Sequence, residues 1–261
     1  MPSALITGAA KGIGRAIAGE LAQRKYDLFL IDIDEYELLR TARRLEEQYG
    51  IFTYTLTLDL SQPEVAQTIQ SWYEQFRKDL TVVVNNAGFG LNGSFEQIPI
   101  AEQLELINVN IKALVEISYA FIPILKQQSK AYLLNVGSTT AYQTVPYVSI
   151  YAASKAFVVS FTRGLRHELR NSNLSVSCLS PGSTDTDFVN RARMGESIRK
   201  TAAKVNMSPE AVAKIAVKGV FRGDSEIIPG FINQVGAFLP RVIPKAFIEK
   251  VVGDIYEPKD N

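Results

Sequence analysis

Short apolar segments alternate with amphipathic segments along most of this 261-residue chain, and this alternation constrains its fold more than any other feature. The apolar segments have the length of strands, and residues 82–84 are three consecutive valines, which is typical of a strand buried on both faces. The segments between them repeat apolar residues at helical spacing. We expect strands near residues 4–7, 27–32, 52–58, 80–88, 131–138, 174–182 and 225–230, and helices near residues 14–25, 35–50, 61–78, 101–126, 150–170 and 208–223.

This order predicts a parallel sheet with helices on both faces, because each parallel strand needs a crossover from the one before. No linker or repeat interrupts the pattern, so we expect a single α/β domain over residues 1–261, doubly wound around about seven strands. Ser61 has the character of an N-cap with Pro63 in the first helical turn, and Gly50 of a helix end. A ligand should bind beyond the carboxyl ends of the strands.

Composition and charge argue against several classes of protein. The 28 basic and 27 acidic residues give a net charge of +1 without a long basic block, so we expect no nucleic-acid partner. A single cysteine, Cys178, cannot form an internal disulfide, and we expect a cytoplasmic location. The one histidine, His167, lies in a charged helical segment, so we expect no metal site and no histidine-based triad. Neither a secretory signal nor a transmembrane segment is expected.

Three glycines, Gly8, Gly12 and Gly14, lie between the first predicted strand and the first predicted helix. A phosphate site needs a tight turn, close backbone approach and an exposed helix N-terminus, and glycines supply the first two. The helix dipole favours the anion. The strand before and the helix after favour phosphate binding over a plain tight turn.

The spacing of these glycines, T-G-x-x-x-G-x-G, resembles that of the short-chain dehydrogenase/reductase family, and other motifs of the family follow in order. The matching residues are Asp59, the N-N-A-G of residues 85–88, Asn110, Ser138, Tyr151 with Lys155, and the P-G-S-T-D-T of residues 181–186. The resemblance covers roughly residues 3–230 and implies a Rossmann-type fold. Ala113 stands where relatives often have glycine, outside the catalytic set.

Tyr151 and Lys155 are four positions apart on a predicted helix, so they share one face. An adjacent ammonium, helped by a cationic cofactor ring, would lower the pKa of a phenol from its ordinary value of about 10. The resemblance implies that Tyr151 is the general acid/base and that Lys155 also holds the nicotinamide ribose. It implies that Ser138 binds the substrate oxygen and that Asn110 helps to hold a water.

The resemblance also assigns a dinucleotide site. The residues that it implies are Thr7, Gly8, Lys11, Gly12, Ile13, Gly14, Asp32, Asp59, Leu60, Asn86, Ala87, Gly88, Tyr151, Lys155, Pro181, Gly182, Thr184 and Thr186. Asp59 is expected to contact the adenine ring.

Two residues disagree about which dinucleotide is bound. Asp32 ends the second predicted strand, where an acidic residue binds the ribose hydroxyls of NAD and repels the extra phosphate of NADP. Lys11 favours NADP, since a basic residue there attracts that phosphate in many relatives. Ile33 is not the basic residue that NADP-using relatives often have. We predict NAD as the cofactor, with NADP as the alternative.

Several residues on the expected substrate side of the site allow two interpretations. Phe89, Tyr142 and Tyr147 either line the substrate or pack within loops, and Arg191 and Arg193 either bind an acidic substrate group or face solvent. In relatives, the variable segment near residues 183–207 covers the substrate. The apolar tail near residues 230–256 either packs on this lid or on another subunit, or it contacts a membrane surface.

We therefore expect an NAD(P)-dependent oxidoreductase that interconverts a secondary alcohol and a carbonyl. Two alternatives stay open: an NADPH-dependent ketoreductase acting on an acyl or lipid carbonyl, and a dinucleotide-sensing regulator without catalysis. Phe157, Val158, Phe161 and Leu165 point in too many directions for one helix stripe, so we expect a homodimer or homotetramer.

Overall fold

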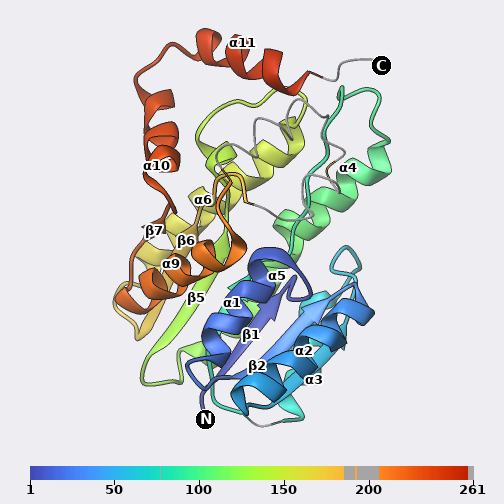
Figure 1. Cartoon of the computed structure of the whole chain (residues 1–261), viewed down its shortest axis with the longest axis vertical. Coiled ribbons are helices and arrows are strands. Elements are labelled where there is room, and N and C mark those ends of the chain that lie inside the picture. Colours follow the sequence, from blue (N-terminus) through green and yellow to red (C-terminus); the bar gives the residue numbers. More distant parts are fainter. Residues whose placement is uncertain (77, 185–191, 193–205, 258–261) are drawn as a thin grey trace.

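The computed structural model describes residues 1–76, 78–184, 192 and 206–257. Within this part of the chain, seven parallel strands form one sheet in the order β3-β2-β1-β4-β5-β6-β7 (Figure 1). The strands are β1 (Ser3–Thr7), β2 (Asp27–Asp32), β3 (Thr53–Thr57), β4 (Leu80–Asn85), β5 (Ala131–Val136), β6 (Leu174–Leu179) and β7 (Glu226–Ile227). The predicted doubly wound, Rossmann-type sheet is confirmed.

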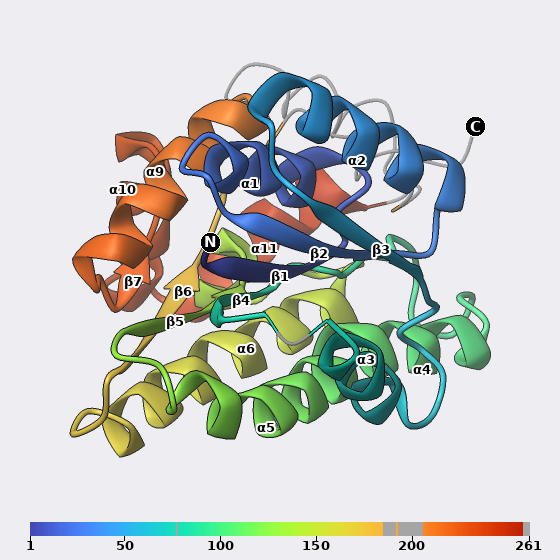
Figure 2. The same ribbon diagram turned by 90° about the horizontal axis from the view of Figure 1, so that it is seen from below.

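Helices cover both faces of the sheet (Figure 2). One face carries α1 (Gly12–Ala22), α2 (Glu35–Tyr49) and α9 (Pro209–Arg222). The other carries α3 (Val65–Glu74), α4 (Ile100–Ile107), α5 (Leu114–Leu125) and α6 (Ser149–Glu168). A π-helical turn, η1 (Asn108–Ala113), joins α4 to α5, and the 3-10 turn η2 (Thr139–Tyr142) follows β5.

Successive residues of each central strand enter opposite hydrophobic cores. In β1, Ala4 and Ile6 pack with the core under α1, whereas Leu5 between them packs with the core under α5. Val82 and Val84 of β4 alternate with Val83 in the same way. A strand buried on both faces needs apolar residues at consecutive positions, which explains the uninterrupted valines of the sequence.

One of two predicted helix ends is confirmed and the other is wrong. Gly50 ends α2 in the left-handed conformation at φ 62°, as expected for a glycine C-cap. The N-cap predicted at Ser61 is wrong, because α3 begins only at Val65 with Glu64 as its N-cap. The Ser61 N–H donates instead to Asp59 Oδ1 at 2.9 Å, so Ser61 and Pro63 lie in a turn before the helix.

The long helical stretch Ile100–Leu125 is the one candidate among the described residues that is long and apolar enough to cross a membrane by length and composition. In this fold Ile117, Phe121 and Leu125 of that stretch are buried in the core against the sheet. Packing accounts for these three residues, whereas Ile100 and Leu104 of the same stretch are exposed.

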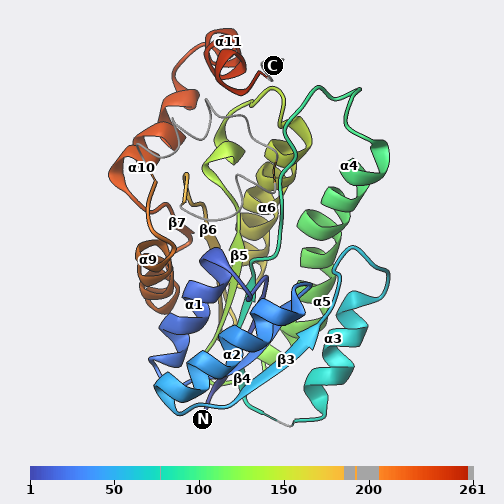
Figure 3. The ribbon, with the colours of Figure 1, turned by 45° about the vertical axis from the view of Figure 1, so that its right-hand side comes forward.

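The chain after β7 forms α10 (Phe231–Phe238), the 3-10 turn η3 (Leu239–Arg241) and α11 (Lys245–Tyr256). α11 lies at the opposite end of the molecule from the N-terminus, and α10 runs along one side toward it (Figures 1 and 3). Most of the predicted lid at residues 183–207 falls outside the described residues, including Arg191 and Arg193. That the whole chain is one domain stays a prediction.

Candidate active site

The direction of winding reverses between β1 and β4, so the loops that follow these two strands leave the sheet at the same edge. Thr7 holds them together: its Oγ1 accepts hydrogen bonds from the backbone N–H groups of Asn86 and Ala87 at 3.0 and 3.1 Å. The Asn86 side chain also connects the two loops, because its Nδ2 donates to the carbonyls of Thr7 and Gly8 at 2.9 and 3.0 Å. Thr7 and Asn86 therefore fix the shape of the glycine turn.

The glycine turn encloses a concave space, a cradle that side chains at the glycine positions would occupy. Gly8 and Gly12 have φ of 66° and 56°, in the region that favours glycine. A Cβ on Gly14 would lie 2.0 Å from the Gly8 carbonyl oxygen. Lys11, the N-cap of α1, makes no side-chain capping bond, so the N-terminal N–H groups of α1 are left for an anion. The site fits the pyrophosphate of a dinucleotide, and half-buried Ile13 anchors the first helical turn in the core.

Asp32 lies at the end of β2, beside this turn. Its Oδ2 accepts from the Ala10 N–H at 2.9 Å and its Oδ1 from the Asp34 N–H at 3.1 Å, so the carboxylate is held in place. Lys11 forms its ion pair with Asp34 rather than Asp32, with Nζ 2.7 Å from Asp34 Oδ2. The ammonium group of Lys11 is therefore held toward the start of α2. The geometry leaves Asp32 as the fixed acidic group beside the glycine turn.

Asp59 and Leu60 follow β3, further along the same edge. Asp59 accepts hydrogen bonds from the Ser61 N–H and from Gln62 Nε2, at 2.9 and 3.0 Å, and Leu60 is buried in the core under α5. Their predicted contact with an adenine ring stays a prediction.

All four predicted catalytic side chains are buried at the carboxyl ends of β4 and β5. Asn110, Lys155, Ser138 and Tyr151 have exposed fractions of 1%, 5%, 7% and 8%. Lys155 Nζ donates to the Val136 carbonyl at 2.9 Å and lies 5.8 Å from the centre of the Tyr151 ring. The Ser138 side chain hydrogen-bonds the Tyr151 phenol. The structure thus brings Ser138, Tyr151 and Lys155 together.

Asn110 lies in the π-helical turn that widens the helix between α4 and α5. Its Nδ2 donates to the Phe89 carbonyl at 2.9 Å and to Ser154 Oγ at 3.1 Å, and its Oδ1 accepts from the Phe89 N–H at 3.1 Å. A Cβ on Gly88 would come within 2.9 Å of Asn110 Oδ1 and 3.2 Å of Lys155 Nζ. Glycine at residue 88 therefore keeps open the space that Asn110 and Lys155 face.

The electrostatics of the pair differ from the sequence-based expectation. Burial raises the pKa of the Tyr151 phenol to about 12, against a smaller lowering by the Ser138 hydrogen bond. Burial also lowers the pKa of Lys155 to about 8. Desolvation of the buried phenolate is the largest cause of the rise, and it outweighs the lowering by Ser138.

The turn after β6 packs against the site from the other side. The Thr139 N–H donates to the Pro181 carbonyl at 3.0 Å, and Thr184 Oγ1 donates to the Gly182 carbonyl at 3.1 Å. A Cβ on Gly182 would lie 2.2 Å from Asn233 Oδ1 of α10, so the tail packs closely on this turn. Thr186, the last residue assigned to the cofactor, lies outside the described residues.

The three candidate aromatic residues have separate environments. Phe89 is buried in a small apolar cluster that also contains Tyr151. The Tyr142 hydroxyl donates to Glu226 Oε1 at 2.7 Å, so this side chain is tied to β7. The Tyr147 hydroxyl donates to Glu257 Oε1 at 3.0 Å. Of the three, Phe89 is the one that shares a cluster with the predicted catalytic tyrosine, Tyr151.

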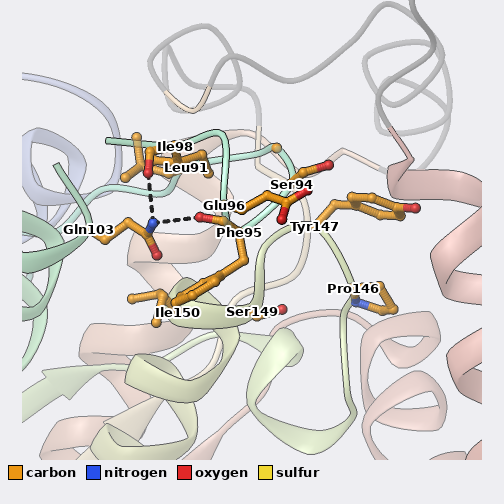
Figure 4. A pocket seen from close by; sticks show the side chains of 11 residues that line it. Leu91, Ser94, Phe95, Glu96, Ile98, Gln103, Pro146, Tyr147, Ser149 and Ile150 are labelled. Atoms are coloured by element: carbon orange, nitrogen blue, oxygen red, sulfur yellow. Dashed lines mark hydrogen bonds between the residues drawn. The ribbon is translucent and has the colours of Figure 1, made fainter. Parts of the chain in front are cut away.

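A pocket of about 330 Å³ opens between the loop after β4 and the start of α6 (Figure 4). Leu91 and Ile98 lie on one side of it and Ile150 on the other, and all three also pack with the cluster around Tyr151. Gln103 Nε2 closes one end by donating to the carbonyls of Phe95 and Ile98, both at 2.9 Å. The pocket therefore shares walls with the candidate active site.

The sequence did not point to Asn92 or Tyr256. Asn92 Nδ2 donates to the Tyr256 carbonyl at 3.1 Å, and the Tyr256 side chain packs on the cluster that contains Tyr151. The available signal was the spacing of Val252 and Tyr256, four apart on one helix face. Nothing local says which part of the protein that face covers.

Comparison with known proteins gives the same answer as the geometry. The sequence model of short chain dehydrogenases matches residues 2–197. The chain belongs to the short chain dehydrogenase family. It is an oxidoreductase of this family, with the Rossmann-type fold that the family shares.

Three curated relatives and one solved structure illustrate the similarity. An uncharacterized oxidoreductase of Staphylococcus saprophyticus is 29% identical over 215 residues, which cover 82% of this chain and 88% of that protein. Very-long-chain 3-oxoacyl-CoA reductase-B of Danio rerio is 30% identical over 244 residues, covering 92% and 72%. This chain spans 53% of the Laccaria bicolor very-long-chain 3-oxoacyl-CoA reductase. A short-chain dehydrogenase from Sphingobium yanoikuyae, solved with NADPH, is 28% identical with a TM-score of 0.81, covering 94% of this chain and 98% of its own.

Proposed function

We propose that this protein interconverts a secondary alcohol and a carbonyl compound, with Tyr151 as the general acid/base. The observation that carries the proposal is the buried group of Ser138, Tyr151 and Lys155 at the same sheet edge as the glycine cradle. A bound nicotinamide supplies or accepts the hydride. The protein must then move one proton to or from the substrate oxygen.

The roles of the side chains follow from their hydrogen bonds. The Tyr151 phenol is the proton donor in reduction, and the Ser138 hydroxyl beside it binds the same substrate oxygen. Lys155 Nζ, held by the Val136 carbonyl, keeps positive charge near the phenol and is available to the nicotinamide ribose. Asn110 holds the backbone of Phe89 and faces Lys155 across Gly88, as expected for a residue that helps to hold a water.

The walls near Tyr151 favour an apolar substrate. Phe89, Leu91, Val145 and Val148 are all buried in the cluster with it. An acyl or lipid carbonyl is the second candidate, favoured by the names of the 3-oxoacyl-CoA reductase relatives. The complete set of Ser138, Tyr151 and Lys155 argues against a dinucleotide sensor without catalysis, which would have no need of all three.

Replacing Tyr151 by phenylalanine tests the chemistry. We expect Tyr151→Phe to reduce turnover by at least about a hundredfold, because proton transfer is lost while the ring is kept. Dinucleotide affinity should stay within about twofold of that of the wild type, since the phenol hydroxyl is a small part of that site.

The assay screens alcohols and ketones with both dinucleotides and follows the absorbance of the reduced nicotinamide. Tyr119→Phe, which alters a tyrosine that is 81% exposed on α5, is the matched control and should stay active. Wild-type activity in Tyr151→Phe would exclude the proposed mechanism.

Asp32 selects NAD over NADP in this proposal. Its carboxylate is fixed by two backbone N–H groups beside the glycine turn, whereas Lys11 is held by Asp34. The extra phosphate of NADP would add close to two negative charges near Asp32. The Sphingobium yanoikuyae relative binds NADPH, so the choice rests on the side chains of this chain.

Titration of both oxidised dinucleotides into the wild type and Asp32→Ala checks this selection. We expect the wild type to bind NAD more tightly, and the variant to narrow the preference by about tenfold, the scale of one charge repulsion near a surface. Glu47→Ala, an exposed acidic change on α2, serves as the control. Tighter NADP binding by the wild type, or an unchanged preference in Asp32→Ala, would remove Asp32 from this role.

Assembly into a two-fold symmetric homodimer or homotetramer is also proposed. Phe157 is 40% exposed on α6 and stacks on Phe161 with ring centres 5.8 Å apart, whereas Val158 is buried in the subunit. A partly exposed aromatic pair on this helix is suited to a partner subunit. The mass measured by light scattering at micromolar concentration should exceed the 28.9 kDa of one chain, and a monomer alone would contradict the proposal.

The cytoplasmic location stays a prediction that cell fractionation can check.

A further inference from the structure

The C-terminal helix α11 forms part of the wall around the catalytic tyrosine. Val252 and Tyr256, on its inner face, pack against the apolar cluster that contains Phe89, Leu91 and Tyr151. The charge of an ionised Tyr256 would raise the pKa of Tyr151, so the two phenols lie within electrostatic reach of each other. The opposite face of α11 exposes Phe247, Val251 and Ile255. α11 therefore lies between the apolar cluster that contains Tyr151 and the solvent.

Contacts across more than a hundred residues of sequence hold the end of α11 in place. Asn92 Nδ2 donates to the Tyr256 carbonyl at 3.1 Å, and the Tyr147 hydroxyl donates to Glu257 Oε1 at 3.0 Å. Tyr147 has a φ of 63°, a conformation that costs a non-glycine residue about 1 kcal/mol or more. Its carbonyl accepts from the Gly93 N–H at 2.8 Å, which keeps this conformation in place. Tyr256 therefore has a defined position.

The Tyr256 hydroxyl is a polar group in an apolar wall. Its side chain is half-buried, and burial raises its pKa, so the phenol stays protonated at neutral pH. Within the described part of the chain, no hydrogen bond joins this hydroxyl to another group. A neutral phenol in such a place can donate one hydrogen bond and accept others. The hydroxyl is not among the fully buried unpaired atoms of the described residues, so it reaches solvent, and a bound molecule with a suitable oxygen can pair with it in place of water.

We propose that Tyr256 is a specificity-determining residue that hydrogen-bonds a second oxygen of the substrate, distinct from the oxygen that reacts at Tyr151. The inference rests on the proposed alcohol–carbonyl oxidoreductase function and narrows its substrate class. The preferred substrate is an apolar ketone or secondary alcohol with another carbonyl or hydroxyl oxygen a few bonds from the reacting carbon. The apolar walls bind the hydrocarbon parts, and Tyr256 distinguishes such molecules from plain ketones.

The test compares a 3-oxo ester with the plain ketone of the same chain length, using the full-length wild type, Tyr256→Phe and the control Tyr119→Phe. For the 3-oxo ester, Tyr256→Phe should lower kcat/KM about fivefold, mainly through KM, as expected for one lost hydrogen bond. For the plain ketone, the same variant should stay within about twofold of the wild type. Melting temperature and dinucleotide affinity near those of the wild type establish that the variant is folded.

The outcomes distinguish failure of the proposed oxidoreductase function from failure of the proposed role of Tyr256. A wild type that turns over neither compound nor any member of the alcohol and ketone panel overturns the proposed oxidoreductase function. An active wild type in which Tyr256→Phe changes both substrates equally, or neither, overturns the role of Tyr256 alone. A loss confined to the 3-oxo ester supports it, provided that Tyr119→Phe shows no such loss.

Discussion

The Lys155 side chain lies almost completely buried at the end of β5, where it donates to the carbonyl of Val136, and the proposed chemistry depends on it. Burial lowers the pKa of Lys155 from its ordinary value to about 8. Keeping this group charged near neutral pH therefore costs the folded protein about 3 kcal/mol. This is a sizeable fraction of the stability of an ordinary domain. The two apolar cores on either side of the sheet supply the stability that makes such a burial possible.

The same burial acts on the Tyr151 phenol. The Tyr151 phenol, with a pKa raised to about 12 by burial, is a weak acid and would make a costly phenolate. Ser138 offsets part of that cost through its hydrogen bond, and Lys155 lies 5.8 Å from the ring. An oxidised nicotinamide adds a positive charge when it binds. In the proposed mechanism, dinucleotide binding and proton transfer would therefore be coupled at Tyr151.

Much of the site could be predicted from the sequence because its residues belong to short local motifs. Gly8, Gly12 and Gly14 fall in one turn, and Tyr151 and Lys155 fall on one helix face, so spacing alone relates them. The alternation of strands and helices along the chain predicted the parallel sheet that brings these two groups together.

Features that depend on residues distant in the sequence could not be predicted. The start of α3 depends on the Asp59 turn, which replaces the N-cap expected at Ser61. The rise in the Tyr151 pKa depends on burial by residues from several segments. Tyr256 reaches the site from a tail more than a hundred residues away, held by Asn92, and no local pattern encodes that contact.

The coupling between cofactor and Tyr151 can be measured directly by ultraviolet titration of tyrosine ionisation with and without oxidised dinucleotide. Among the 11 tyrosines of the chain, comparison of the wild type with Tyr151→Phe isolates the catalytic one. With the dinucleotide bound, we predict that one phenol of the wild type ionises below a pH of about 9, and that this transition is missing from Tyr151→Phe. Without the dinucleotide, Tyr151 should stay protonated up to a pH close to its pKa of about 12. Identical titration curves for the two proteins in the presence of the dinucleotide would contradict the account.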